Sequence, residues 1–425
     1  RGSATAIFRG EKRTMDYLAR MTRVSRSRQP SAIRKLAPLL SEPGMISLGG
    51  GLPNRTLFPF SAMSVRIGDE NVTLSPDQLS TALQYSQTPG LPSLLSWIHK
   101  LQLAKHGVTI ADQRMCCVSG GSQESFSRVV EMLVEPTGTI MVDDPCYSGA
   151  LAFLQPYCNL VGVRTDANGL DPEHLDELLS GWTRSSPKPR VLYTNTTASN
   201  PTGATLSVER RPILYNVAQK HDIIILEDDP YFFLHPNHDS IPSLLSLDSD
   251  NRVIRFDSFS KVLSSGIRIG FATGPKPLIE RINLHTQAVN LHTSGVSQML
   301  VSVLFDNWGL DGFDDHLKKC AEFYNGQRDY LLESANRHLD GLASWNTPEA
   351  GMFLWMKLLN GVSDTKNLIE KKAVDAKVLF VPGQSFTVDN SRSPYIRAAY
   401  STSSRDEMEE AMKRLANLIR AESTH

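Results

Sequence analysis

From residue 114 onward, short apolar runs alternate with longer segments that have helical periodicity. The apolar runs between residues 115 and 274 are MCCVSG, TIMVDDP, LVGVRTD, RVLYTN, DIIILEDDP, RVIRFDS and IGFATG. Several end in Asp, Asn, Gly or Ser, where a strand passes into a loop. Strands that alternate with helices in this way are typical of a mostly parallel sheet with helices on both faces. The sequence therefore predicts an α/β fold, with ligands at the carboxyl ends of the strands.

A second unit follows the alternating region. After about residue 275, long helical patterns lead to three strand-like pieces, GMFLWMKL, KVLFVPG and YIRAAYS, with a helix around TKNLIEKKAVDA between them. This order predicts a smaller α+β domain at the C-terminus. The expected organisation is a leader or expression remnant at 1–14, an N-terminal arm belonging to the small domain at 15–60, a large domain at 61–325 and a C-terminal small domain at 326–425.

Composition and charge exclude several classes of protein. The chain has 425 residues and a net charge of -1, so it has no charge excess that would attract nucleic acid or anionic lipid. No apolar run approaches the roughly 18 residues that a membrane helix needs. The five cysteines are odd in number and lack metal-binding spacing, which indicates unpaired thiols in a reducing compartment and no metal site.

A basic stretch, RMTRVSRSRQP at residues 20–30, contains serines and no acidic residue. It is compatible with a mitochondrial-type leader and equally with an N-terminal arm that lies across a partner surface. The expected location is accordingly the cytoplasm or the mitochondrial matrix.

The loop VSGGSQES follows a predicted strand and begins an amphipathic helix near Gln123. Glycines at a helix N-terminus expose backbone N–H groups, which suit a phosphate, although an ordinary strand-to-helix turn has the same pattern. The loop lacks the GxGxxG and GxxxxGK[ST] motifs, so neither a dinucleotide nor a nucleoside triphosphate is indicated.

Two further loops carry polar side chains in constrained surroundings. In SNPTG, Pro201 favours an extended conformation at Asn200, which fixes its amide in space, and a simple turn is the alternative reading. In IIILEDDPYFF, Asp228 and Asp229 end an apolar strand and cannot both be buried without a cationic partner. One candidate partner is a protonated heteroaromatic nitrogen.

Lys261 lies in RFDSFSKVLSSG, among serines and a glycine just after a strand-like run. It is either a solvated loop charge or a nucleophile in a pocket of small residues.

Taken together, Asn200 in NPTG, Asp228 and Tyr231 in DDPYF, Lys261 in SFSK and Arg268 seven residues later resemble the pyridoxal-phosphate-dependent aminotransferases of fold type I. The chain is most similar to the kynurenine/2-aminoadipate aminotransferases, from about residue 15 to the end. Shared segments include ISLGGGLPNRTLFPF, ALQYSQTPGLPSLLSWI, GPKPLIERI and AGMFLWMK. The resemblance implies a mostly parallel central sheet with helices on both faces, which binds the cofactor, and a smaller α+β domain.

The resemblance also implies a role for each motif residue. Lys261 would form the Schiff base with pyridoxal 5'-phosphate and carry the proton during the reaction. Asp228 would keep the ring nitrogen protonated, while Asn200 and Tyr231 would bond to the ring oxygen. Tyr147 would stack on the ring, and the phosphate would be held by Ser122, Gln123, Ser258, Ser260 and Arg268.

Substrate contacts and a partner subunit follow from the same resemblance. Arg397 in YIRAAYS resembles the residue that receives the substrate α-carboxylate in two parallel hydrogen bonds, although a surface arginine on a strand is the alternative. Arg34, Gly50 and Leu52 resemble a mobile N-terminal segment that closes over the substrate. Tyr85 resembles a phosphate ligand from the other subunit, which implies a homodimer.

Two departures from the family pattern stand out. The chain has TNTTASNPTG where relatives have a loop like VPNGNNPTG, and Glu124 follows the phosphate loop where relatives have a neutral residue. Neither departure touches a position that the cofactor requires. We expect the two departures to affect substrate preference instead.

The implied reaction is a ping-pong transfer of an amino group from an L-amino acid to a 2-oxo acid such as 2-oxoglutarate. The resemblance implies kynurenine, 2-aminoadipate and other aromatic or aliphatic amino acids as donors. The sequence itself does not fix which side chains are accepted, because no second arginine can be assigned to a distal carboxylate. A β-eliminating lyase on the same scaffold is the nearest alternative. A regulatory domain with an aminotransferase fold is the other, but only a short basic arm precedes residue 30.

Overall fold

The computed structural model describes residues 15–36, 39, 42–46, 48–49, 51–183, 186–359 and 361–422. The proposed remnant at 1–14, Gly50 and the side chain of Arg34 lie outside this description. None of the helices within the described ranges combines the length and the apolarity needed to cross a membrane.

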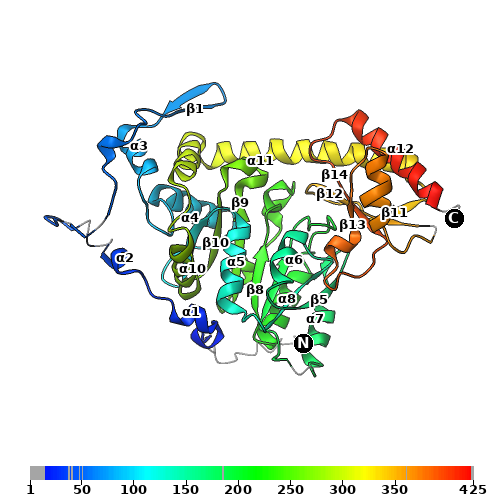
Figure 1. Cartoon of the computed structure of the whole chain (residues 1–425), viewed down its shortest axis with the longest axis horizontal. Coiled ribbons are helices and arrows are strands. Elements are labelled where there is room, and N and C mark those ends of the chain that lie inside the picture. Colours follow the sequence, from blue (N-terminus) through cyan, green and yellow to red (C-terminus); the bar gives the residue numbers. More distant parts are fainter. Residues whose placement is uncertain are drawn as a thin grey trace, which may run out of the picture.

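A sheet of eight strands forms the centre of the molecule, in the order β3-β10-β9-β8-β7-β4-β5-β6 (Figure 1). Strands β4, β5, β7, β8 and β9 are parallel, whereas β10 is antiparallel to both of its neighbours and β6 is antiparallel to β5. The predicted mostly parallel sheet is confirmed. The bounds are β3 Arg114–Ser119, β4 Thr139–Asp144, β5 Asn159–Asp166, β6 Gly169–Leu170, β7 Val191–Asn195, β8 Ile224–Asp228, β9 Val253–Ser258 and β10 Gly270–Pro275.

Helices cover both faces of this sheet, which explains the apolar run at the start of strand β8. Ile224 and Leu226 pack in one hydrophobic cluster with residues of α5 and α10, whereas Ile225 packs in another with residues of α7 and α8. Successive side chains of a strand point to opposite faces, so the part of a strand that is covered on both sides is apolar at consecutive positions. The helices are α4 Pro92–His106, α5 Ser122–Leu133, α6 Ser148–Leu154, α7 Pro172–Ser180, α8 Arg210–Lys220, α9 Leu244–Leu247 and α10 Lys276–Val289.

A smaller antiparallel sheet, in the order β11-β12-β14-β13, forms near the C-terminus. One face packs on the second half of α11, on the π-helical turn η8 and on α12, in a hydrophobic cluster separate from those of the large sheet. The elements are β11 Ala343–Trp345, β12 Phe353–Leu358, η8 Leu368–Ala373, β13 Val381–Pro382, β14 Tyr395–Ala399 and α12 Arg405–Glu422.

The predicted strand KVLFVPG is wrong in extent, because only Val381 and Pro382 pair with β14. Lys377 has a positive φ of 58°, which breaks an extended conformation, and Leu379 is 80% exposed instead of lying against the core.

Helix α11, Gly295–Leu339, joins the two sheets and runs along the upper edge of Figure 1. The long helical patterns predicted after residue 275 are confirmed, and within α11 the helical backbone is broken at Gly309, where φ is 64°. The first half packs on α3 and α4, and the second half packs on α12. The small sheet therefore packs on a helix whose first half packs in the large domain.

The N-terminal region divides into a packed part and an extended part. Met21 is buried, Thr22 Oγ1 donates to the carbonyl of Glu131, and Arg281 Nη1 donates to the carbonyl of Ser25. These contacts attach part of the basic stretch to α5 and α10. The elements are η1 Leu18–Arg20, α1 Arg23–Ser27, α2 Ala32–Leu36, η3 Arg55–Leu57, β1 Ser64–Ile67, β2 Glu70–Thr73 and α3 Pro76–Leu83.

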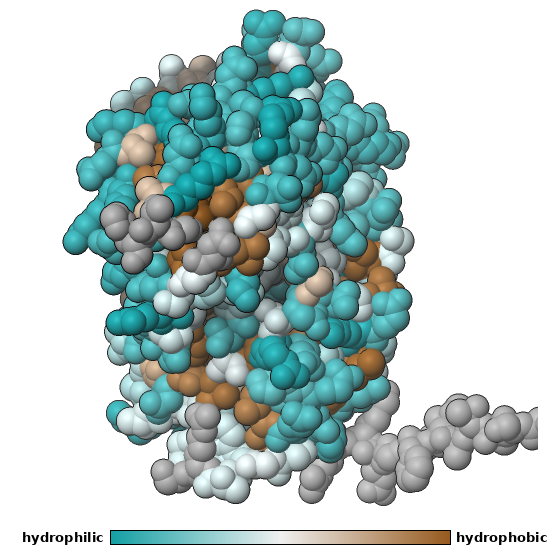
Figure 2. All heavy atoms as spheres, turned by 90° about the vertical axis from the view of Figure 1, so that its right-hand side faces the viewer, coloured by the Kyte–Doolittle hydropathy of each residue, from teal (hydrophilic) through white to brown (hydrophobic). Residues whose placement is uncertain are grey.

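The extended part, at the left of Figure 1, exposes large apolar side chains. Ile46 is 88% exposed, Leu48 98% and Leu57 80%. By contrast, hydrophilic side chains cover most of the end of the molecule that carries the small sheet (Figure 2). Contiguous exposed apolar residues are typical of a protein interface.

Candidate active site

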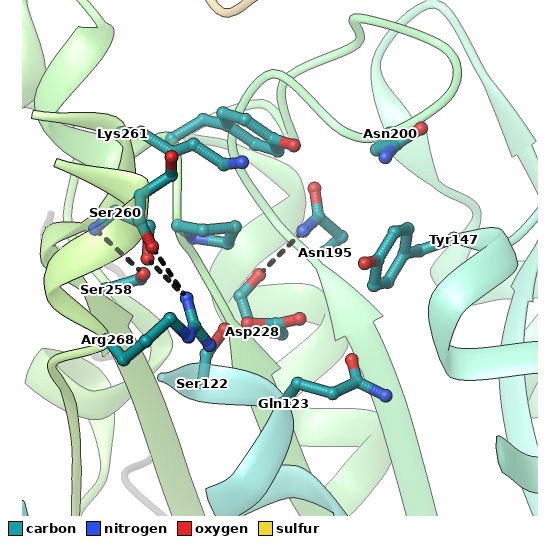
Figure 3. Close-up of a pocket in the computed structure, with 13 residues that line it drawn as sticks. Ser122, Gln123, Tyr147, Asn195, Asn200, Asp228, Ser258, Ser260, Lys261 and Arg268 are labelled. Carbon is teal, nitrogen blue, oxygen red and sulfur yellow. Dashed lines mark hydrogen bonds between the residues drawn. The ribbon is translucent and has the colours of Figure 1, made fainter. Parts of the chain in front are cut away.

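A cavity of about 150 Å³ opens at the carboxyl ends of β7, β8 and β9 (Figure 3). These neighbouring strands end in Asn195, Asp228 and Ser258, and all three residues line the cavity. The structure thus has a cavity at the strand ends, where the sequence predicts a ligand. The lining residues are Ser122, Gln123, Tyr147, Asn195, Asn200, Asp228, Pro230, Tyr231, Ser258, Ser260, Lys261, Ser265 and Arg268.

Asp228 lies at the floor of the cavity and is buried. Tyr193 Oη donates to its Oδ2 at 2.7 Å, whereas its Oδ1 is buried without a hydrogen-bond partner. Burial raises the pKa of Asp228 to about 7. Because the carboxyl group lacks a lysine or arginine at ion-pair distance within the described residues, a cationic ligand would restore its charged form.

Asp229 points away from the cavity and has the cationic partner that the sequence required. Arg255 Nη1 lies 3.0 Å from Asp229 Oδ2, and Thr197 Oγ1 donates to the same oxygen at 3.1 Å. Arg255 also pairs with Glu227 and Asp257, and all four side chains are completely buried. Asp229 is therefore paired with Arg255 inside the protein, whereas Asp228 remains available to bind a ligand.

Lys261 projects into the cavity from the end of η6, Phe259–Lys261. Its Nζ lies 5.9 Å from the centre of the Tyr231 ring. Burial, together with the positive charge of Arg268, lowers the pKa of Lys261. A lower pKa increases the fraction of neutral amine, which is the nucleophilic form, so the surroundings of Lys261 favour a nucleophile over a solvated loop charge.

Arg397 on β14 reaches the loop that follows β7. Its Nη1 donates to Asn200 Oδ1 at 2.7 Å, and its Nε is buried without a partner. The guanidinium carbon lies 4.4 Å from the centre of the Phe353 ring and 5.1 Å from that of Phe386. Burial lowers the pKa of Arg397. This arginine is enclosed rather than a surface residue on a strand, and part of its hydrogen-bonding capacity is unused.

The N-terminus of α5 and the side chain of Arg268 form a cradle at the base of the cavity. Arg268 Nη2 donates to the carbonyl of Gly120 at 2.5 Å, and its Nη1 donates to Ser260 Oγ at 3.2 Å. Gly121 has a φ of 110°, and a Cβ atom there would lie 2.3 Å from Arg268 Nη2, so only glycine allows this approach. Free N–H groups of a helix N-terminus beside a guanidinium group suit a dianionic phosphate.

Tyr147 lies across the cavity from Lys261 and Arg268 (Figure 3). A Cβ atom on Gly149 would lie 2.3 Å from its ring, so the backbone packs directly against the tyrosine. Gln123 Nε2 donates to the carbonyl of Gly149 at 3.0 Å, which ties this wall to α5. The ring is thereby held in place and can stack on a planar ligand.

The two departures from the family pattern are accommodated outside the cavity wall. Glu124 Oε2 accepts from the backbone N–H of Gly120 at 2.6 Å, and its Oε1 accepts from Asn290 Nδ2 at 2.9 Å, so this carboxylate connects the cradle to the end of α10. In TNTTASNPTG, Thr196 and Thr197 are fully buried and bond to Glu227 and Asp229.

Some predicted residues lie apart from the cavity. Tyr85 is 53% exposed and makes an edge contact with His292, at 6.0 Å between ring centres. Leu52 is 54% exposed. Sequence reasoning missed Asn195, whose Nδ2 donates to the carbonyl of Asp228 at 3.0 Å. Its position at the end of the predicted strand RVLYTN was the available signal.

The cavity fits pyridoxal 5'-phosphate by its own chemistry. The unpartnered Oδ1 of Asp228 matches a protonated ring nitrogen, and the cradle at Arg268 matches the phosphate group. The enclosed Lys261 matches the aldehyde. No group of three or more potential metal ligands occurs in the part of the chain that the structure describes.

Comparison with known proteins agrees with this chemistry. Residues 73–415 match the sequence profile described as aminotransferase class I and II. A kynurenine/alpha-aminoadipate aminotransferase from Bos taurus, described as mitochondrial, is 44% identical over 423 residues, which cover 96% of this chain and 99% of the relative. The chain belongs to the class I and II aminotransferases, and it is a pyridoxal-phosphate-dependent enzyme of fold type I.

Solved structures agree over nearly the full length. Aminotransferase Aro8 from Candida albicans superposes with a TM-score of 0.87 at 29% identity, covering 98% of this chain and 100% of that chain. A kynurenine aminotransferase from Pyrococcus horikoshii, in complex with PMP, KYN and KYA, gives a TM-score of 0.76 at 28% identity and covers 96% and 98% of the two chains.

Proposed function

We propose that the enzyme transfers the amino group of kynurenine, 2-aminoadipate or other aromatic and aliphatic L-amino acids to a 2-oxo acid such as 2-oxoglutarate, in a ping-pong cycle. The observation that carries the proposal is the partly buried guanidinium of Arg397, which donates to Asn200, a residue that lines the cavity together with Lys261. An α-carboxylate is common to every donor and acceptor of this reaction, and an arginine with unused N–H groups binds it in two parallel hydrogen bonds. The name of the bovine relative supports the choice of donors.

The cofactor supplies an aldehyde that takes up the amino group and a ring that accepts the electron pair released at the substrate Cα. Lys261, with its lowered pKa, acts first as the nucleophile and then as the base that removes the Cα proton. Asp228 would hold the proton on the ring nitrogen. For transamination, Lys261 would carry the proton taken from the substrate Cα, so its amine must reach both ends of that transfer from one face.

The remaining lining residues orient the ring and exclude water. Tyr147, Asn200 and Tyr231 line the cavity; with the cofactor bound, Tyr147 would cover one face of the ring, and Asn200 and Tyr231 would hydrogen-bond to the ring oxygen. Burial raises the pKa of Tyr231, which keeps its hydroxyl protonated and therefore able to donate. Ser122, Gln123, Ser258, Ser260 and Arg268 hold the phosphate, so that the cofactor stays bound while Lys261 is displaced.

We also propose that the active unit is a homodimer in which Tyr85 reaches the phosphate of the partner subunit. The supporting observations are that Tyr85 is half exposed and outside the cavity of its own chain, and that Ile46, Leu48 and Leu57 expose large apolar surfaces nearby in sequence. In this arrangement Leu52, with Arg34 and Gly50, belongs to the segment that closes over the substrate.

The domain boundaries that we propose are an arm at 15–60, a large domain at 61–325 and a small domain at 326–425. The support is that the hydrophobic cluster of the small sheet begins at Leu331, whereas Leu317 still packs with the large domain. The proposed location is the cytoplasm or the mitochondrial matrix, and the mitochondrial name of the bovine relative favours the second.

The half-reaction tests the proposal and separates it from a lyase. Enzyme mixed with excess kynurenine and no 2-oxo acid should convert the bound cofactor to its aminated form, with one 2-oxo acid released per site. Added 2-oxoglutarate should restore the original absorption spectrum. Release of ammonia with the cofactor spectrum unchanged would instead identify a lyase.

A further inference from the structure

Tyr193 on β7 is a buried tyrosine that none of the proposed roles uses. It is 1% exposed, its ring centre lies 4.7 Å from that of Phe126, and its hydroxyl donates to Asp228 Oδ2 at 2.7 Å. The second oxygen of the same carboxyl group, Oδ1, has no partner. The hydroxyl therefore occupies one oxygen of Asp228 and leaves the other for the cavity.

The chemical type of the group that donates to Asp228 determines whether it adds a positive charge beside the carboxylate. A lysine or arginine beside Asp228 would hold the carboxylate but would compete with a protonated ring nitrogen for its charge. A phenol stabilises the charged carboxylate by a hydrogen bond and adds no positive charge. The buried guanidinium of Arg255 is bonded to Asp229 and Asp257 instead.

We propose that Tyr193 is a positioning residue for the cofactor. It fixes the orientation of the Asp228 carboxyl group, stabilises its charged form and so keeps the proton on the ring nitrogen. This inference rests on the proposed role of Asp228.

The test is the variant Tyr193→Phe, which removes the hydroxyl and keeps the ring. Its matched control is Tyr215→Phe, because Tyr215 is also buried and donates to a carboxylate, Asp248, at 3.0 Å, outside the cavity. Two quantities are measured without any amino acid present: the dissociation constant of pyridoxal 5'-phosphate, and the ¹⁵N chemical shift of its labelled ring nitrogen when bound.

Tyr193→Phe should raise the dissociation constant by roughly tenfold, the usual loss for a hydrogen bond to a charged group, and move the nitrogen resonance toward the unprotonated position. Tyr215→Phe should change neither, although both variants lower the melting temperature. If Tyr193→Phe lowers the melting temperature but leaves the dissociation constant and the resonance at their wild-type values, the tyrosine is only structural and the inference is wrong.

A second measurement tests whether the effect of Tyr193 passes through Asp228. In an Asp228→Asn background the charged acceptor is gone, so adding Tyr193→Phe should change the dissociation constant less than twofold. A further tenfold loss there would mean that Tyr193 does not act through Asp228. If Asp228→Asn alone leaves both quantities unchanged, the proposed role of Asp228 fails, which is a separate outcome.

Discussion

The substitution Arg397→Lys tests whether the fork geometry, rather than charge alone, binds the α-carboxylate. Arg397 is held by Asn200 and by the faces of Phe353 and Phe386, so a lysine keeps the positive charge but cannot present two parallel N–H groups. One charge-assisted hydrogen bond is lost, which is worth about 1.5–3 kcal/mol. The expected decrease in kcat/KM is therefore about tenfold to about 150-fold.

The assay follows the two half-reactions separately by the change in cofactor absorbance. Since the amino acid and the 2-oxo acid both present an α-carboxylate, both half-reactions should slow by a similar factor. Arg405→Lys is the matched control, because Arg405 also stacks on an aromatic ring of the small domain, 3.3 Å from the centre of Tyr330. It should leave both rates unchanged.

The reasoning would be refuted if Arg397→Lys slowed only one half-reaction, because a shared carboxylate contact cannot act on one substrate alone. An equal loss in Arg405→Lys would also refute it, since the cause would then be a general weakening of the small domain.

Three other predictions follow from the site. Lys261→Ala should retain the cofactor through the cradle at Arg268 but lose turnover and borohydride labelling, and labelling of a wild-type peptide without Lys261 would contradict the assignment. Tyr85→Phe should weaken cofactor binding by about 1 kcal/mol, and a fully active monomer in sedimentation at assay concentration would exclude the proposed dimer. Burial raises the pKa of Asp228 from 3.8 to about 7, so the cofactor-free protein binds a proton more tightly when folded. Its stability in urea should fall as the pH rises from about 4 to about 7, and Asp228→Asn should flatten that dependence.

The strands of the large sheet were predictable because each is an apolar run that is buried on both faces and ends in a polar residue. The same rule pointed to Asp228, and local motifs pointed to Lys261 and Arg268, which line the cavity as expected. Each of these motifs and strand ends consists of a few neighbouring residues, so it can be recognised from the sequence alone.

The features that escaped prediction depend on contacts between distant segments. Tyr193 reads as one more apolar residue of a strand, and only the register of β7 and β8 brings it to Asp228. The strand expected at KVLFVPG failed because of the backbone conformation at Lys377, which its sequence does not signal. The hairpin of β1 and β2 was also missed, because its strands have only four residues each and are mostly exposed, so they contain few apolar residues.

The position of Arg397 has a consequence for biosynthesis. The residues that line the cavity lie between residues 122 and 268 and belong to the sheet that is synthesised before the small sheet, whereas Arg397 lies in a late strand and joins Asn200 across 197 residues of chain. A nascent chain thus contains every lining residue of its own cavity before it contains the arginine proposed to bind substrate. The ability to bind the α-carboxylate therefore arises only when synthesis is nearly finished.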